Sequence, residues 1–169
     1  MMNHLLRRGF LVSCLAVTII SASWAQAPLP PPKTNFSGRW RMVKDKSDFK
    51  TFQAPDIIVR VIDQHDPTMN IHTVQTKGQK TTTADVSYYT DGAVANNVIN
   101  GHDASSKSFW DGPDLVVRTD MKDSKNDDIT IEDRYQLSQD GKTLTTLSHI
   151  TTPKGEVNLT LVCEKEGES

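Results

Sequence analysis

The chain has 169 residues, of which 24% are charged, and a formal net charge of −2 at pH 7. Positive and negative side chains are mixed along the sequence, and no basic patch is interleaved with aromatic residues, so the composition disfavours nucleic-acid binding. The length allows one domain with a real hydrophobic core, even after an N-terminal targeting segment is set aside.

The first 25 residues have the features of an export signal. Arg7 and Arg8 form its positive start, residues 10–20 form an apolar run, and Ser23 and Ala25 place small side chains where signal peptidase cleaves. The apolar run is shorter than the roughly 20 residues that a membrane-spanning helix needs. We therefore expect cleavage after Ala25 and a mature protein that is periplasmic or secreted, with no stable membrane span.

The two cysteines lead to different expectations. Residues 11–14 resemble a lipobox, which would make Cys14 a lipidated N-terminus, but the apolar run continues past Cys14 and favours ordinary cleavage. Cys163 then remains alone, so an intramolecular disulfide is impossible. Because Cys163 alternates with Leu159 and Leu161 on one face of a predicted strand, we expect a small buried hydrophobic side chain there rather than a reactive thiol.

After the signal we expect a proline-rich linker at 26–34, one domain at 35–166 and a short tail at 167–169. Turn signals rich in Gly, Asn and Asp recur about every ten residues through the domain, which is typical of an antiparallel sheet of hairpins. These signals lie at 66–67, 77–78, 91–92, 100–101, 111–113, 123–126, 140–141 and 153–155.

Between the turns, apolar and polar residues alternate with a period of two, as in a sheet with one wet face. In residues 129–137, for example, Ile129, Ile131, Tyr135 and Leu137 share one face. The sequence therefore predicts an all-β, up-and-down meander of about ten antiparallel strands, closed into a barrel because closure removes exposed edges. Only residues 45–55 depart from this pattern. There we expect one helical turn capped by Ser47, with Phe49 and Phe52 packing inward.

The segment 36–44, which contains Gly38-Arg39-Trp40, resembles the first strand of lipocalins and intracellular fatty-acid-binding proteins of the calycin superfamily. Residues 107–112 and 140–144 add to this resemblance, which is strongest to small secreted bacterial lipocalin-like proteins. It implies a lipocalin-like barrel in which Gly38 allows close packing and Trp40 plugs one end. It also implies that Lys165 on the last strand lies against Trp40 in a cation–π contact.

The sequence departs from the fatty-acid-binding pattern at its ligand clamp. Leu161 and Cys163 occupy the places where those proteins hold a lipid carboxylate with Arg and Tyr, so fatty-acid binding is not carried over. We expect an exported binding protein for a small apolar or amphipathic ligand, neutral in charge. The alternatives are a structural or interaction protein whose barrel is filled by its own side chains and, less favoured, an enzyme built in a barrel mouth.

Four residues are candidates for the lining of a ligand cavity. Tyr88, Trp110 and Tyr135 each combine an apolar body with a polar tip, although the same residues would serve as core. Arg60 alternates with Ile58 and Ile62, which would point it inward as an anchor for an anion. The favoured alternative is an outward Arg60 beside inward-facing Ile57, Val59 and Val61.

No pattern of catalytic, metal-binding or cofactor-binding residues occurs in the sequence. The histidines lack the short spacings of a metal site, the acidic turn at 123–128 lacks the glycine of a calcium loop, and no nucleophile elbow or phosphate loop is present. We therefore expect no metal, no cofactor and no catalysis. A small hydrophobic ligand is the expected partner, and we expect the protein to be a monomer.

Overall fold

The computed structural model describes residues 33–167. The expected export signal, Cys14, most of the linker and the last two residues lie outside the described residues. The described part contains ten strands and one short 3-10 helix, which confirms the prediction of an all-β meander with a single helical turn. The elements in chain order are β1 (Gly38–Met42), η1 (Lys44–Lys46), β2 (Ile57–His65), β3 (Thr68–Lys77), β4 (Lys80–Tyr89), β5 (Ala95–Ile99), β6 (His102–Asp111), β7 (Asp114–Lys122), β8 (Asp128–Leu137), β9 (Thr143–Thr152) and β10 (Gly155–Lys165).

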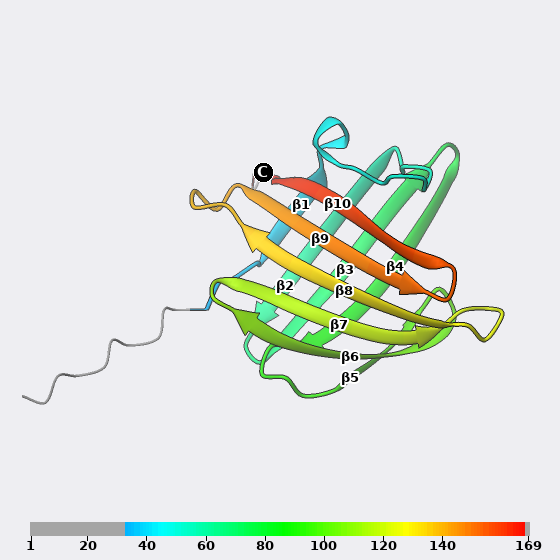
Figure 1. Ribbon diagram of the computed structural model, residues 1–169. Coiled ribbons are helices and arrows are strands. Elements are labelled where there is room, and N and C mark those ends of the chain that lie inside the picture. Colours follow the sequence, from blue (N-terminus) through cyan, green and yellow to red (C-terminus); the bar gives the residue numbers. More distant parts are fainter. Residues whose placement is uncertain (1–32, 168–169) are drawn as a thin grey trace, which may run out of the picture. The chain divides into compact units, whose positions relative to one another are not determined.

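The ten strands form one antiparallel sheet that curls into a nearly closed barrel. Their order is β4-β3-β2-β1-β10-β9-β8-β7-β6-β5, so neighbouring strands are consecutive in sequence except β1 and β10, which join the two ends of the chain. Strands β2–β4 lie behind strands β8–β10 and run across them (Figure 1). The two halves of the sheet thus face one another, and their inward side chains share one interior.

The barrel has a seam where β4 and β5, the two edges of the sheet, meet without a backbone ladder. Within residues 33–167, the side chain of Asn97 is the one that hydrogen-bonds across from β5 to β4. The Ser87 N–H donates to Asn97 Oδ1 (2.9 Å), and Asn97 Nδ2 donates to the Ser87 carbonyl (3.0 Å). The Asn97 amide therefore takes the place of one backbone pair between the two edge strands.

One end of the barrel, which we call the closed end, is filled by large side chains with almost no exposure. They come from β1 and the segment just before it and from the starts of β3, β7 and β9. Its most buried members are Phe36, Trp40, Met69, Leu115 and Leu144. The buried Gln64 fastens this end, because its Oε1 accepts the Phe36 N–H (2.9 Å) and its Nε2 donates to the Thr34 carbonyl (3.1 Å).

The opposite end, which we call the open end, is less filled. Inward-facing apolar side chains there are only half-buried, and we call this set the apolar collar: Met121, Ile129, Ile131, Ile150 and Leu159. Thr82 and Ala84 on β4 lie opposite inward-facing residues of β3 and are nevertheless exposed. The interior is therefore packed shut at one end and accessible at the other.

The link between β1 and β2 differs in detail from its prediction. The 3-10 turn spans Lys44–Lys46, and Ser47 lies at its C-terminal end, where its hydroxyl donates to the Val43 carbonyl (2.9 Å) instead of capping an N-terminus. Phe49 packs against the core as expected, but Phe52 is 53% exposed. The inward orientation expected for Phe52 is therefore wrong.

Candidate functional site

Arg60 points into the barrel, so the favoured expectation of an outward Arg60 is wrong. The reason is the register of β2 on β1, which places Arg60 directly opposite Trp40. Directly paired residues share a face of the sheet, and Trp40 is fully buried inside. Of the residues expected to face inward, Ile57 and Val61 are 43% and 38% exposed, and only Val59 is buried.

The Arg60 side chain spans the interior. Its Nη1 donates to Thr146 Oγ1 (3.2 Å) on β9, although β1 and β10 separate β2 from β9 in the sheet. Its Nε–H is buried and has no hydrogen-bond partner in the described structure. An unsatisfied buried donor is rare in folded proteins and destabilising, so this atom marks a place where an acceptor is missing.

A second charged residue, Asp133 of β8, also faces the interior. It accepts a hydrogen bond from the Ser148 hydroxyl of β9, the residue directly opposite it in the ladder. Burial raises the pKa of Asp133, while the Ser148 hydrogen bond and the positive charge of Arg60 act in the opposite direction. Asp133 is half-buried, and its pairing with Val117 and Ser148 places its side chain on the interior face of the sheet.

Sequence reasoning missed Asp133, although the signal was present. The residue occupies the inward position between Ile131 and Tyr135 in the alternation of the strand. A carboxylate in an otherwise apolar face is unusual, because a buried charge is costly unless it is paired. That break in the pattern was sufficient to single it out.

The two predicted tyrosines lie in the same part of the interior as Arg60 and Asp133. Tyr88 and Tyr135 are buried, and burial raises the pKa of both hydroxyls, with the nearby Asp133 charge raising them further. Small hydroxyl side chains complete what we call the polar belt. Its members are Arg60, Tyr88, Ser106, Thr119, Asp133, Tyr135, Thr146 and Ser148.

Trp110, the remaining candidate for the cavity lining, lies away from the polar belt. Its ring stacks on Phe36 at the closed end, with centroids 6.1 Å apart and planes 7° apart. Its Nε1 donates to the Thr90 carbonyl (2.9 Å), and Lys33 Nζ lies 5.7 Å from the ring centroid. The other neighbour of Phe36 is Tyr135, with ring centroids also 6.1 Å apart, so Trp110 belongs to the closed end and reaches the polar belt only through Phe36 and Tyr135.

The residues of the Gly-x-Trp signature meet at the closed end. Trp40 is paired with Lys165 in the β1–β10 register, and Lys165 Nζ lies 5.3 Å from the Trp40 ring centroid. Gly38 has a φ of +147°, and a Cβ there would lie 2.6 Å from Lys165 Cε. A side chain at position 38 would therefore be strained in backbone and would displace Lys165.

Cys163 is also buried inside the barrel, in agreement with the alternation of its strand. Burial raises the pKa of its thiol to about 11. A thiol with a raised pKa is a poor nucleophile near neutral pH. It is a free cysteine and, within residues 33–167, has no disulfide partner.

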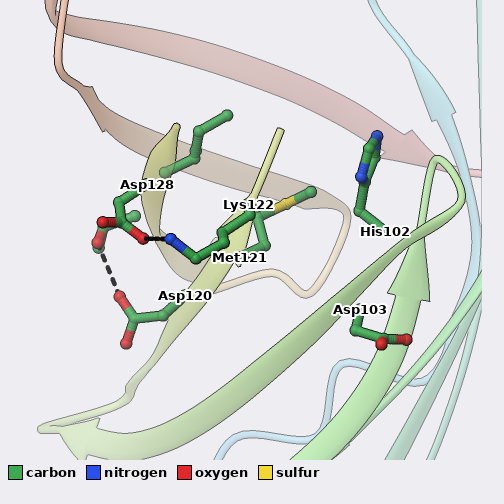
Figure 2. A pocket seen from close by; sticks show the side chains of 8 residues that line it. His102, Asp103, Asp120, Met121, Lys122 and Asp128 are labelled. Carbon is green, nitrogen blue, oxygen red and sulfur yellow. Dashed lines mark hydrogen bonds and ion pairs between the residues drawn. The ribbon is translucent and has the colours of Figure 1, made fainter. Parts of the chain in front are cut away.

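A pocket of about 620 Å³ lies at the rim of the open end, where β6, β7 and β8 meet (Figure 2). Met121 and Ile129 of the apolar collar line it from inside. Its outer wall is charged, with Lys122 Nζ bonded to Asp128 (2.7 Å), and His102 stands at the opposite side of the view. This pocket thus has two residues of the apolar collar and mostly polar residues of the rim in its lining.

The described residues contain no cluster of His, Cys, Asp and Glu suited to a metal ion. Among the same residues, none forms a helix long and apolar enough to cross a membrane. The polar belt is therefore the most chemically specific feature that the described chain presents.

Solved structures share this fold at low sequence identity. A secretory abundant heat soluble protein from Ramazzottius varieornatus matches with a TM-score of 0.56 and 16% identity, over 77% of this chain and 94% of its own. Zebrafish ileal bile acid-binding protein complexed with cholic acid matches with a TM-score of 0.56 and 14% identity, over 78% and 98%. Human cRBP IV matches with a TM-score of 0.50 and 16% identity, over 79% and 99%.

The chain therefore has a lipocalin-like barrel fold, as the resemblance at the Gly-x-Trp segment implies. No protein-family model and no curated protein sequence matches the chain.

Proposed function

We propose that this chain is an exported carrier that holds one small amphipathic molecule inside its barrel. The observation that carries the proposal is the buried Nε–H of Arg60, which has no acceptor in the described structure. A ligand oxygen or nitrogen would satisfy this donor and recover the free energy lost by leaving it unpaired. Ligand sites commonly consist of an apolar lining with a few polar groups that fix orientation.

The distribution of side chains sets the orientation of the ligand. Its polar group lies at the polar belt, near Arg60, and its apolar body extends past Ile131 and Leu159 of the apolar collar toward the open end. The rim pocket lined by Met121 and Ile129 provides the entry. The zebrafish structure supports this proposal, because a barrel of the same fold is described there as complexed with cholic acid.

The exported location is part of the proposal and depends on residues 1–25. Arg7, Arg8 and the small residues before Gln26 direct the chain out of the cytoplasm and are then removed. Expression of the full chain, followed by mass measurement of the protein in the exported fraction, tests this. A mature protein that begins at Gln26 is the expected result, and a full-length intracellular product would contradict it.

Ligand carriage is tested by native mass spectrometry of the exported protein and by titration with N-phenylnaphthylamine, a neutral fluorescent amphiphile. We expect a co-purifying small molecule or saturable probe binding that Arg60→Met weakens. A clean apo mass together with no probe binding would show that the barrel is filled by its own side chains. That outcome would replace the carrier with the structural or interaction role.

A further inference from the structure

The polar belt contains one positive and one negative residue that do not pair with each other. Arg60 donates to Thr146, Asp133 accepts from Ser148, and no ion pair joins the two within residues 33–167. They are nevertheless close, because their partners Thr146 and Ser148 are two residues apart on the same face of β9. That spacing corresponds to about 7 Å along a strand.

Each charged side chain has hydrogen-bonding capacity left for a third group. Arg60 has its unpartnered Nε–H, which needs an acceptor. Asp133 makes its side-chain hydrogen bond through one carboxylate oxygen, to Ser148, which leaves the other oxygen open to the interior. A ligand group between them must therefore accept from Arg60 and donate to Asp133. Uncharged hydroxyl, amide and amine groups do both, whereas a carboxylate or sulfonate can only accept and an ammonium can only donate.

The charge balance leads to the same choice. Arg60 and an ionised Asp133 cancel within the barrel, so an uncharged head group leaves the interior neutral. An anionic head group adds a buried charge that has a cation on one side and a carboxylate on the other, which is unfavourable at low dielectric. The other titratable groups facing the pair are Tyr88, Tyr135 and Cys163, whose raised pKa values keep them neutral.

We infer that Arg60 and Asp133 together form a selectivity filter that admits amphiphiles with an uncharged donor–acceptor head group and excludes anionic ones. This inference depends on the proposed carrier function, because it specifies the ligand class of the same site. The sequence led to the expectation of a neutral ligand with Arg60 facing outward. Because Arg60 faces inward, that expectation now depends on the balance of its positive charge by the negative charge of Asp133.

The test uses two fluorescent probes with the same ring skeleton. N-phenylnaphthylamine is uncharged and carries an N–H, and anilinonaphthalene sulfonate adds a permanent negative charge. We expect the wild-type protein to bind the neutral probe at least about tenfold more tightly. Asp133→Asn removes the negative partner and should raise the affinity for the sulfonate at least about tenfold relative to the neutral probe.

Two further variants make the comparison specific. Glu132→Gln removes one negative charge from the adjacent outward position of β8 and should leave the ratio of the two affinities unchanged. The double variant Arg60→Gln with Asp133→Asn removes both charges and should return the preference to the neutral probe. Far-UV circular dichroism and thermal unfolding establish that each variant is folded before its titration.

The outcomes separate this inference from the carrier proposal. Binding of neither probe to the wild-type protein would overturn both. The selectivity filter alone would be overturned if the protein binds the neutral probe but Asp133→Asn leaves the ratio of the two probe affinities unchanged. It would also be overturned if Glu132→Gln changes that ratio as much as Asp133→Asn does. If Asp133→Asn does not fold, Arg60→Gln gives the opposite test. In Arg60→Gln the carboxylate of Asp133 has no cation to balance it, so dodecylammonium should displace the neutral probe at least about tenfold better than it does from wild type. No gain in displacement would overturn the selectivity filter.

Discussion

The Nζ of Lys165 lies 5.3 Å from the ring centroid of Trp40, across the pair of strands that joins the two ends of the chain. The indole N–H on the same ring donates to the Phe36 carbonyl (2.9 Å). Trp40 is thus held by the last strand, the entry segment and the core at once. The closed end depends on this residue more than on the cation above it.

The first prediction compares Trp40 with Lys165. Trp40→Ala should lower the free energy of unfolding by about 3–5 kcal/mol, because it leaves a large cavity among fully buried side chains. Lys165→Met keeps most of the apolar stem and removes only the charge, so its loss should be about 0.5–1 kcal/mol. Urea denaturation followed by far-UV circular dichroism measures both. A loss below about 1 kcal/mol for Trp40→Ala would contradict its role as the plug.

The second prediction concerns the seam between β4 and β5. Asn97→Ala removes both hydrogen bonds to Ser87 and should cost about 1–2 kcal/mol of stability. The Ser87 amide should also exchange its hydrogen faster, because its acceptor is gone. Asn96→Ala is the matched control on the exposed face of β5 and should change stability by less than about 0.5 kcal/mol. Equal exchange rates at Ser87 in both variants would refute the bridging role of Asn97.

The third prediction concerns the pH dependence of stability through Asp133. Its pKa is raised in the folded protein above the ordinary value of 3.8, so the folded state keeps a proton that the unfolded chain has already lost. This contribution to stability is present below pH 3.8 and is lost as the pH rises through the folded-state value. Asp133→Asn has no such proton, and its stability relative to wild type should increase over that window.

The measurement for Asp133 is a series of urea unfolding curves from pH 3 to pH 9, with Glu132→Gln as the control for loss of one negative charge on the same strand. The stability difference between Asp133→Asn and wild type should rise and then level off. A difference that falls with increasing pH would mean that Arg60 and Ser148 lower the Asp133 pKa by more than burial raises it.

The fourth prediction concerns the thiol of Cys163. Because it is buried and its pKa is raised to about 11, it should react with Ellman's reagent far more slowly in the folded protein than in denaturant. Protein that begins at Gln26 contains no other cysteine, so the reaction reports this site alone. Rapid reaction of the folded protein would show that the interior opens readily to solutes.

The meander was predictable because its signals are local. Turn residues recur at hairpin spacing, and single strands such as residues 129–137 show their two faces without help from the rest of the fold. Even Cys163 is placed correctly by the alternation of its own strand. These features need no knowledge of which strand pairs with which.

The direction of Arg60 was not predictable in this way. Residues 57–62 are apolar on both faces apart from Arg60, so period two does not say which face is inside. The pairing of Arg60 with Trp40 decides it, and that register joins strands separated by a long connection. Asp133 was predictable from its own strand, whereas its proximity to Arg60 follows only from closure of the sheet.

The seam at Asn97 has a consequence for the range of ligand sizes. A continuous backbone ladder fixes the circumference of a barrel, because widening it breaks many hydrogen bonds together. Here the described β4 edge is held across the seam by a few side-chain hydrogen bonds, two from Asn97 of β5 and one from Ser108 of β6 to the Tyr89 carbonyl, in place of a continuous ladder. The circumference of the barrel is therefore least constrained along this line, and a carrier of the kind proposed would widen there first for a bulkier ligand.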